Sequence, residues 1–151
     1  VRLVDKERSE IIITGRTKHF LSLVGEHLSV DNMNRAIEMV AEELNVSIPE
    51  FTVTGVPVDT FFGHQWYVAC DKNLDEEDLA KRIDEKLKIL NDDYEVERRH
   101  ALKSIKVNIL PESTFLQFLA SKGKIGAQHK FPRVLKGKIL EDWSSFLANQ
   151  Q

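Results

Sequence analysis

Three stretches of the chain alternate apolar and polar residues in the manner of β-strands. In the first two, Phe51 and Val53, then Trp66 and Val68, recur at every second position. We expect strands over residues 51–56, 65–70 and 103–110, the last ended by Pro111. Pro57 and the pair Phe62–Gly63 predict the turn between the first two strands, and the short apolar runs 11–14 and 20–24 predict a small hairpin at the start.

Apolar residues three and four positions apart predict helices between these strands. Ser29 or Asp31 can cap a first helix that ends near Asn45, and Asn73 or Asp75 can cap a second. Their apolar faces comprise Met33, Ile37, Val40 and Leu44, and then Leu79, Ile83 and Leu87. A short helix capped by Ser113 bears Phe115 and Phe118, and a last helix runs through Trp143 and Phe146. This order predicts an α+β domain: a small, mostly antiparallel sheet with helices on one face.

Length and composition set the class of protein. The chain has 151 residues, is 42% hydrophobic and carries a formal net charge of −3, as expected for one globular domain over residues 1–151. It contains no long apolar run and no signal peptide, so we expect a cytoplasmic protein with no membrane segment. The single cysteine, Cys70, follows apolar residues and is expected to be a buried thiol. Because the chain starts at Val1 without a methionine, we expect it to be a fragment of a longer protein.

The basic loop, residues 121–138, is the most unusual segment. Its core, GKIGAQHKFPRVLKGK, places lysines and an arginine around one proline with no acidic residue. Three interpretations are open: a solvated loop, a nucleic-acid interface, or a lysine that reaches a phosphate held by another domain. The acidic start of the second helix and the negative net charge argue against nucleic acid.

Complete active-site motifs are absent from the sequence. It holds neither a Walker-type phosphate loop nor a nucleophilic serine elbow. The five histidines are scattered without metal-ligand spacing, so no metal site is predicted. The residues therefore predict part of a site at most.

Several segments together resemble one family. QHKFPR, residues 128–133, resembles the Gln-Tyr/His-Lys-x-Pro-Arg motif of the auxin-responsive acyl-acid amido synthetases, which have bacterial relatives. Segments 15–29, 63–68 and 102–123 are similar to further parts of that family's C-terminal domain, in the same order. The resemblance covers nearly the whole chain.

The resemblance implies a lid domain of an adenylate-forming ligase. Members activate a carboxylic acid with ATP, and then an amino acid displaces AMP to give an amide. ATP, with Mg²⁺, would be bound mainly by the missing N-terminal adenylation domain, and this chain alone would be inactive. The opening segment, residues 1–29, would serve as the hinge. The hinge sequence GRTKHF departs from that of plant members, so their hormone substrates are not carried over.

The resemblance also implies residue roles. Lys130 matches the motif lysine and would contact the phosphates during adenylation, where a positive charge offsets charge developing at phosphorus. Residues assigned to nucleotide binding and loop orientation are Gln128, His129, Arg133, Arg16 and Lys18. Gly25 and Glu26 would enter the site of the second step, where Glu26 could position the amine. Lys136 and Lys138 are rival phosphate lysines.

A different class of function stays open from the sequence. The chain could be a stand-alone binding module whose basic loop docks an acidic partner or nucleic acid. Steep salt dependence of RNA binding would favour this alternative.

Overall fold

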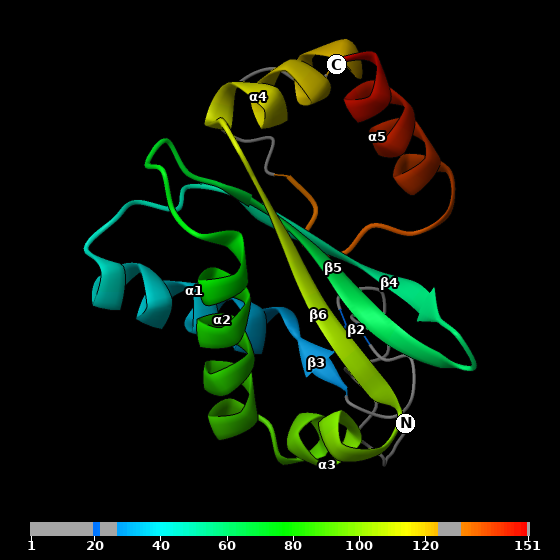
Figure 1. Cartoon of the computed structure of the whole chain (residues 1–151). Coiled ribbons are helices and arrows are strands. Elements are labelled where there is room, and N and C mark those ends of the chain that lie inside the picture. Colours follow the sequence, from blue (N-terminus) through cyan, green and yellow to red (C-terminus); the bar gives the residue numbers. More distant parts are fainter. Residues whose placement is uncertain (1–19, 22–26, 124–130, 151) are drawn as a thin grey trace, which may run out of the picture.

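The computed structural model describes residues 20–21, 27–123 and 131–150 of the chain. Helices and strands alternate along it, as Figure 1 shows. In chain order they are β2 (Phe20–Leu21), β3 (Leu28–Ser29), α1 (Val30–Leu44), β4 (Phe51–Val58), β5 (Phe61–Ala69), α2 (Glu76–Leu90), α3 (Asp92–His100), β6 (Leu102–Leu110), α4 (Glu112–Ser121) and α5 (Gly137–Asn149). None of the helices described is long and apolar enough to cross a membrane.

The central sheet has the order β4-β5-β6. β4 and β5 form an antiparallel hairpin, whereas β5 and β6 run parallel because α2 and α3 carry the chain back between them. The predicted α+β class is confirmed. The sheet is mixed, because it contains one antiparallel and one parallel strand pair. A separate two-stranded sheet pairs β2 with β3. The predicted partner at residues 11–14 lies outside the described residues.

The turn of the β4–β5 hairpin lies at Asp59 and Thr60, between the paired residues Val58 and Phe61. Asp59 adopts a left-handed backbone with φ of 55°. The prediction of a turn at Pro57 and Phe62–Gly63 is therefore wrong. Pro57 fits within the strand because β4 lies at the edge of the sheet, where a missing backbone N–H can face outward.

The first core fills the space between α1, α2 and one face of the sheet. Its fully buried members include Val40 of α1, Ile83 and Leu87 of α2, and Trp66 of β5. The apolar positions of both helices are those that the helical spacing predicts. Burial of such aliphatic side chains stabilises the fold by about 1.5–3 kcal/mol each.

The second core lies at the other face and end of the sheet, around α4 and α5. It gathers Phe115 and Phe118 of α4, Trp143 of α5, and Phe131 from the segment that precedes α5. Tyr67 of β5 packs against this cluster. Helices thus cover parts of both faces rather than one, because α4 and α5 carry apolar faces of their own that must be buried.

Side-chain caps set the starts of α1, α2 and α3, whereas α4 begins after Pro111 without one, so the predicted Ser113 cap is wrong. Ser29, not Asp31, caps α1 by accepting a hydrogen bond from the Asn32 backbone N–H at 3.0 Å. Asn45 ends α1 in a left-handed conformation, as predicted. Asp75 caps α2. Asn91 caps α3, which the sequence pattern did not predict.

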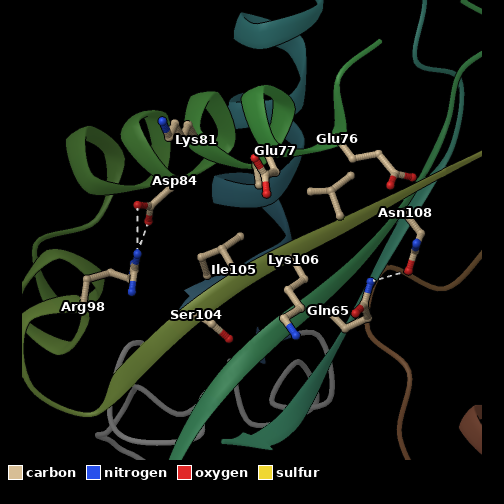
Figure 2. Close-up of a pocket in the computed structure, with 12 residues that line it drawn as sticks. Gln65, Glu76, Glu77, Lys81, Asp84, Arg98, Ser104, Ile105, Lys106 and Asn108 are labelled. Carbon is tan, nitrogen blue, oxygen red and sulfur yellow. Dashed lines mark hydrogen bonds and ion pairs between the residues drawn. The ribbon is translucent and has the colours of Figure 1, made fainter. Parts of the chain in front are cut away.

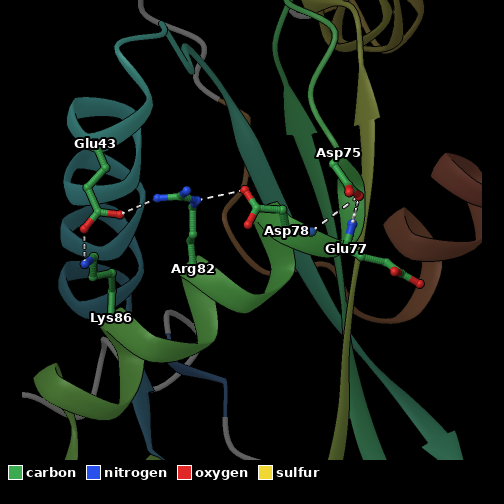
Figure 3. Close-up of polar contacts among 6 residues, drawn as sticks. All are labelled: Glu43, Asp75, Glu77, Asp78, Arg82 and Lys86. Carbon is green, nitrogen blue, oxygen red and sulfur yellow. Dashed lines mark hydrogen bonds and ion pairs between the residues drawn. The ribbon is translucent and has the colours of Figure 1, made fainter.

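An ionic network joins α1 to α2 on the surface (Figure 3). Glu43 of α1 accepts from Arg82 at 3.1 Å and also pairs with Lys86, while Arg82 donates to Asp78 at 2.8 Å. Hydrogen bonding to Lys86 lowers the pKa of the Glu43 carboxyl. Because these groups are in contact with water, the network adds little to the stability that the first core supplies.

Candidate functional site

Most predicted site residues fall outside the part of the chain that the structure describes. These are Lys130, Gln128, His129, Arg16, Lys18, Gly25 and Glu26. Their assigned roles stay predictions. Arg133 and the rival lysines Lys136 and Lys138 are described, as is everything from Phe131 to the start of α5.

Residues 131–135, here called the docking segment, are part of the basic loop and lie along the outer edge of β4. The Val53 N–H donates to the Arg133 carbonyl at 2.9 Å, and the Leu135 N–H donates to the Val53 carbonyl at 2.9 Å. This makes a parallel bridge between Val53 and Val134. The Thr54 hydroxyl adds a hydrogen bond to the Leu135 carbonyl at 2.9 Å. The segment thereby satisfies backbone groups at the β4 edge and is held in one register.

Phe131 anchors the start of the docking segment. Its side chain is only 2% exposed. The ring lies 5.0 Å from Phe115 and 5.0 Å from Trp143, both at steep angles typical of favourable aromatic pairs. The residue that follows Lys130 is therefore fixed in the second core.

Arg133 points back into the domain rather than out from it. Its guanidinium donates to the Glu50 carboxylate at 2.6 Å, to the Asn34 side-chain oxygen at 3.2 Å and to the Phe51 carbonyl at 3.1 Å. It also stacks over the Phe51 ring, with 4.3 Å to the ring centre. These contacts tie the docking segment to α1 and β4. The predicted phosphate contact of Arg133 would have to compete with them.

The start of α5 carries the rival lysines. Lys136 is the exposed residue that precedes the helix, and Gly137 begins it with φ of 60°, a conformation that suits glycine. Lys138 is 82% exposed and its ammonium lies 2.7 Å from the Asp142 carboxylate, one turn along α5. Asp142 also pairs with Lys122 at the end of α4.

Two lysines thus share one carboxylate. Hydrogen bonds from Lys122 and from Lys138 lower the pKa of the Asp142 carboxyl, and the contact with Asp142 raises the pKa of Lys138. Glu141 also acts electrostatically on Lys138, so the two lysines are offset by two carboxylates. The cluster lies beside a cavity of about 340 Å³ that Pro132 and Ile139 also line.

Lys122 and Asp142 were missed by the sequence reasoning. The spacing of Lys138 and Asp142, four residues apart, was a signal for a helical ion pair. The contact of Lys122 with Asp142 spans twenty positions along the chain and has no local signal.

Comparison with known proteins agrees with this architecture. The chain matches the GH3 family C-terminal domain over residues 31–138. No curated protein matches it.

Two solved structures share the fold. The GH3.15 acyl acid amido synthetase superposes with a TM-score of 0.64 at 13% identity, over 83% of this chain and 26% of that one. The AtGH3.15 acyl acid amido synthetase in complex with 2,4-DB gives a TM-score of 0.64 at 14% identity, over 83% and 25%. The chain thus spans about a quarter of the length of these proteins. Because the family match covers well over half of its residues, the chain belongs to the GH3 family, as a C-terminal domain.

Proposed function

We propose that this chain is the C-terminal lid of an ATP-dependent acyl acid amido synthetase. The observation that carries the proposal is the family match over residues 31–138, together with a shared fold in proteins named acyl acid amido synthetases. The remainder of those proteins is about three times as long as the part matched here. An N-terminal adenylation domain would occupy that remainder.

The proposed reaction has two steps. A carboxylate oxygen of the acid attacks the α-phosphorus of ATP, and pyrophosphate leaves, giving an acyl-adenylate. The amine of an amino acid then attacks the acyl carbon, loses a proton and expels AMP, giving an amide. In the first step negative charge grows on the phosphates, with Mg²⁺ at the adenylation domain and a lysine from the lid to offset it.

Lys130 is our candidate for that lysine. It stands one residue before Phe131, which is fixed in the second core, and the docking segment after it is bonded along β4. Because the segment next to Lys130 is firmly held, less entropy is lost when the charged side chain is placed beside the developing negative charge. Gln128 and His129 would orient the same loop.

The rival lysines start from different positions. Lys138 already has a carboxylate partner at 2.7 Å and would have to leave Asp142 to meet a phosphate. Lys136 is exposed at the N-terminus of α5, where no side chain caps the helix. This leaves Lys136 the better placed of the two, and both remain alternatives to Lys130.

The direct test is carboxylate-dependent exchange of labelled pyrophosphate into ATP by the native polypeptide from the source cells. We expect exchange with at least one carboxylic acid, formation of an amide when an amino acid is added, and neither activity from the 151-residue chain alone. A native polypeptide of the length of this chain that forms no adenylate in any fraction would contradict the proposal.

A further inference from the structure

The two outer edges of the central sheet are treated differently. The β4 edge is covered by the docking segment, which supplies a bridge at Val134. The outer edge of β6 has no strand beside it among the described residues. Unpaired strand edges invite pairing with another extended segment.

The ends of the β6 edge are closed by side chains of this domain. At one end the Glu76 carboxylate accepts a hydrogen bond from the Ile109 N–H at 2.7 Å. At the other end Arg98 donates to the Leu102 carbonyl at 2.6 Å while it is held by Asp84 at 2.8 Å. Among the residues that the structure describes, only the middle of the strand is left open.

The open backbone groups belong to Ile105 and Val107. Backbone groups of a strand alternate in direction, and the pairing of residues 104–110 with β5 is free of bulges. Since the Ile109 N–H points outward to Glu76, the N–H groups of Val107 and Ile105 point to the same side.

A cavity of about 620 Å³, here called the edge groove, runs along this stretch. Figure 2 shows α2 above β6, with Ile105 directed toward the helix and with Ser104 and Lys106 on the other side of the strand. Ala80 lies on the α2 wall. The groove thus reaches both faces of the strand edge, which is the space that an added strand would occupy.

The lining decides which segment fits. Successive residues of an added strand would alternate between the α2 side, where Ile105, Val107 and Ala80 lie beside charged side chains of the helix, and the opposite side, which carries Lys106. The charged residues that line the groove with Lys106 are Glu76, Glu77, Lys81, Asp84 and Arg98. The Lys106 ammonium favours an acidic residue opposite. A second copy of β6 would present its own lysine near Lys106, and like charges across a strand pair are unfavourable.

We propose that the edge groove receives an extended segment, with an acidic residue beside Lys106, from the larger remainder of the polypeptide. This rests on the proposed function, under which that remainder exists. The relatives leave about three quarters of their length outside the match, so an intramolecular segment has ample source. Strand addition here would hold the lid to the rest of the enzyme independently of the basic loop.

The test is amide hydrogen exchange in the native polypeptide and in the 151-residue chain. We expect the Ile105 and Val107 amides to exchange at least about tenfold more slowly in the native polypeptide, while the Val40 amide in the first core is protected in both. Equal exchange at Ile105 and Val107 in a polypeptide that forms adenylate would overturn this inference and leave the proposed function intact. Protection without adenylate formation would support strand addition and count against the proposed function.

A pair of charge reversals separates strand addition from general shielding. Lys106→Glu in the native polypeptide should return the Val107 amide to the rate of the 151-residue chain, because it repels the acidic residue opposite. Lys72→Glu makes the same charge change at an exposed position outside the groove and should leave the protection unchanged. If the Val107 amide stays protected in Lys106→Glu, the proposed pairing of Lys106 with an acidic residue is wrong. If Lys106→Glu and Lys72→Glu lose protection equally, the edge groove is not the binding site.

Discussion

The two cores of this domain differ in chemistry and in how they are assembled. The first core is largely aliphatic and joins α1 and α2 to one face of the sheet. The second is built around aromatic rings and brings together α4, α5 and the docking segment. Phe131 and Leu135 of the docking segment belong to the second core, while Val134 packs against the first. The first core maintains most of the fold, and the second fixes the start of the segment on which the proposed chemistry depends.

Aromatic packing suits the role of the second core, which is to fix the docking segment in place. Trp143 contacts the rings of Phe115, Phe118, Phe131 and Phe146. Large rings have few rotatable bonds, so they fix a neighbouring segment at small entropic cost. The difference between the cores can be tested by substitutions that act on one and spare the other.

The largest effect is expected for Trp143→Ala. Removing this fully buried ring should lower the free energy of unfolding by about 3–5 kcal/mol, from lost burial and the cavity left behind. Chemical denaturation measures the loss. In native-state hydrogen exchange the Leu135 amide should lose more protection than the Val40 amide. Equal loss at both amides would show that the two cores are one cooperative unit.

A smaller, pH-dependent effect is expected for Asp84→Asn beside the first core. Burial raises the pKa of the Asp84 carboxyl, but hydrogen bonds from Arg98 and Tyr94 outweigh it, so the pKa lies below its usual value. The ionised carboxylate therefore stabilises the fold above about pH 4, and this stabilisation is lost as the pH falls through the lowered pKa.

We expect Asp84→Asn to cost about 1–3 kcal/mol at pH 7, because a charged hydrogen-bonding partner of Arg98 is removed. Denaturation curves at pH 7 and below pH 3 measure the difference, which should shrink on acidification. A cost that is the same at both pH values would rule out the ionised pair as its cause.

Arg133→Ala tests whether the docking segment positions the loop. The variant loses the contacts to Glu50 and Asn34 and should lower stability by only about 1–2 kcal/mol. Pyrophosphate exchange by the native polypeptide should slow about tenfold with little change in the KM for ATP, because misplacement affects the reacting geometry more than binding. Arg133→Lys, which keeps the charge, should rescue little. A large rise in KM would instead indicate direct contact with the nucleotide.

The smallest effect is expected for Thr52→Val. Among the described residues the buried Thr52 hydroxyl has no hydrogen-bond partner. Replacing it with a methyl of similar shape should be neutral or raise the free energy of unfolding by up to about 1 kcal/mol. A clear loss of stability on denaturation would mean that the hydroxyl has a partner and that the β4 face is more polar than described.

The helical residues of both cores were largely predictable, whereas the place of Phe131 in the second core was not. The spacing of Leu79, Ile83 and Leu87 predicts α2 because helical burial repeats every three to four residues. α3 was missed because Tyr94 is its only buried residue, which leaves no apolar period to detect. The buried thiol predicted for Cys70 is confirmed.

The sequence indicated where along the chain the basic loop lies, but not how its residues are arranged in space. The basic composition of the loop indicated an anion, but the bridge of Val134 to Val53 joins residues about eighty positions apart. The local sequence PRVL does not predict which strand edge this segment pairs with. Arg133 shows the consequence, since its bond to Glu50 has no local signal in the sequence.

The most direct test of the central claim is pyrophosphate exchange by the native polypeptide carrying Lys130→Ala, with Lys138→Ala as the matched control. Loss of one preorganised charge at the α-phosphate should slow exchange about a hundredfold or more. Lys138→Ala should leave it near the parent rate, because Lys138 is paired with Asp142. Unchanged exchange in Lys130→Ala would contradict the role given to Lys130.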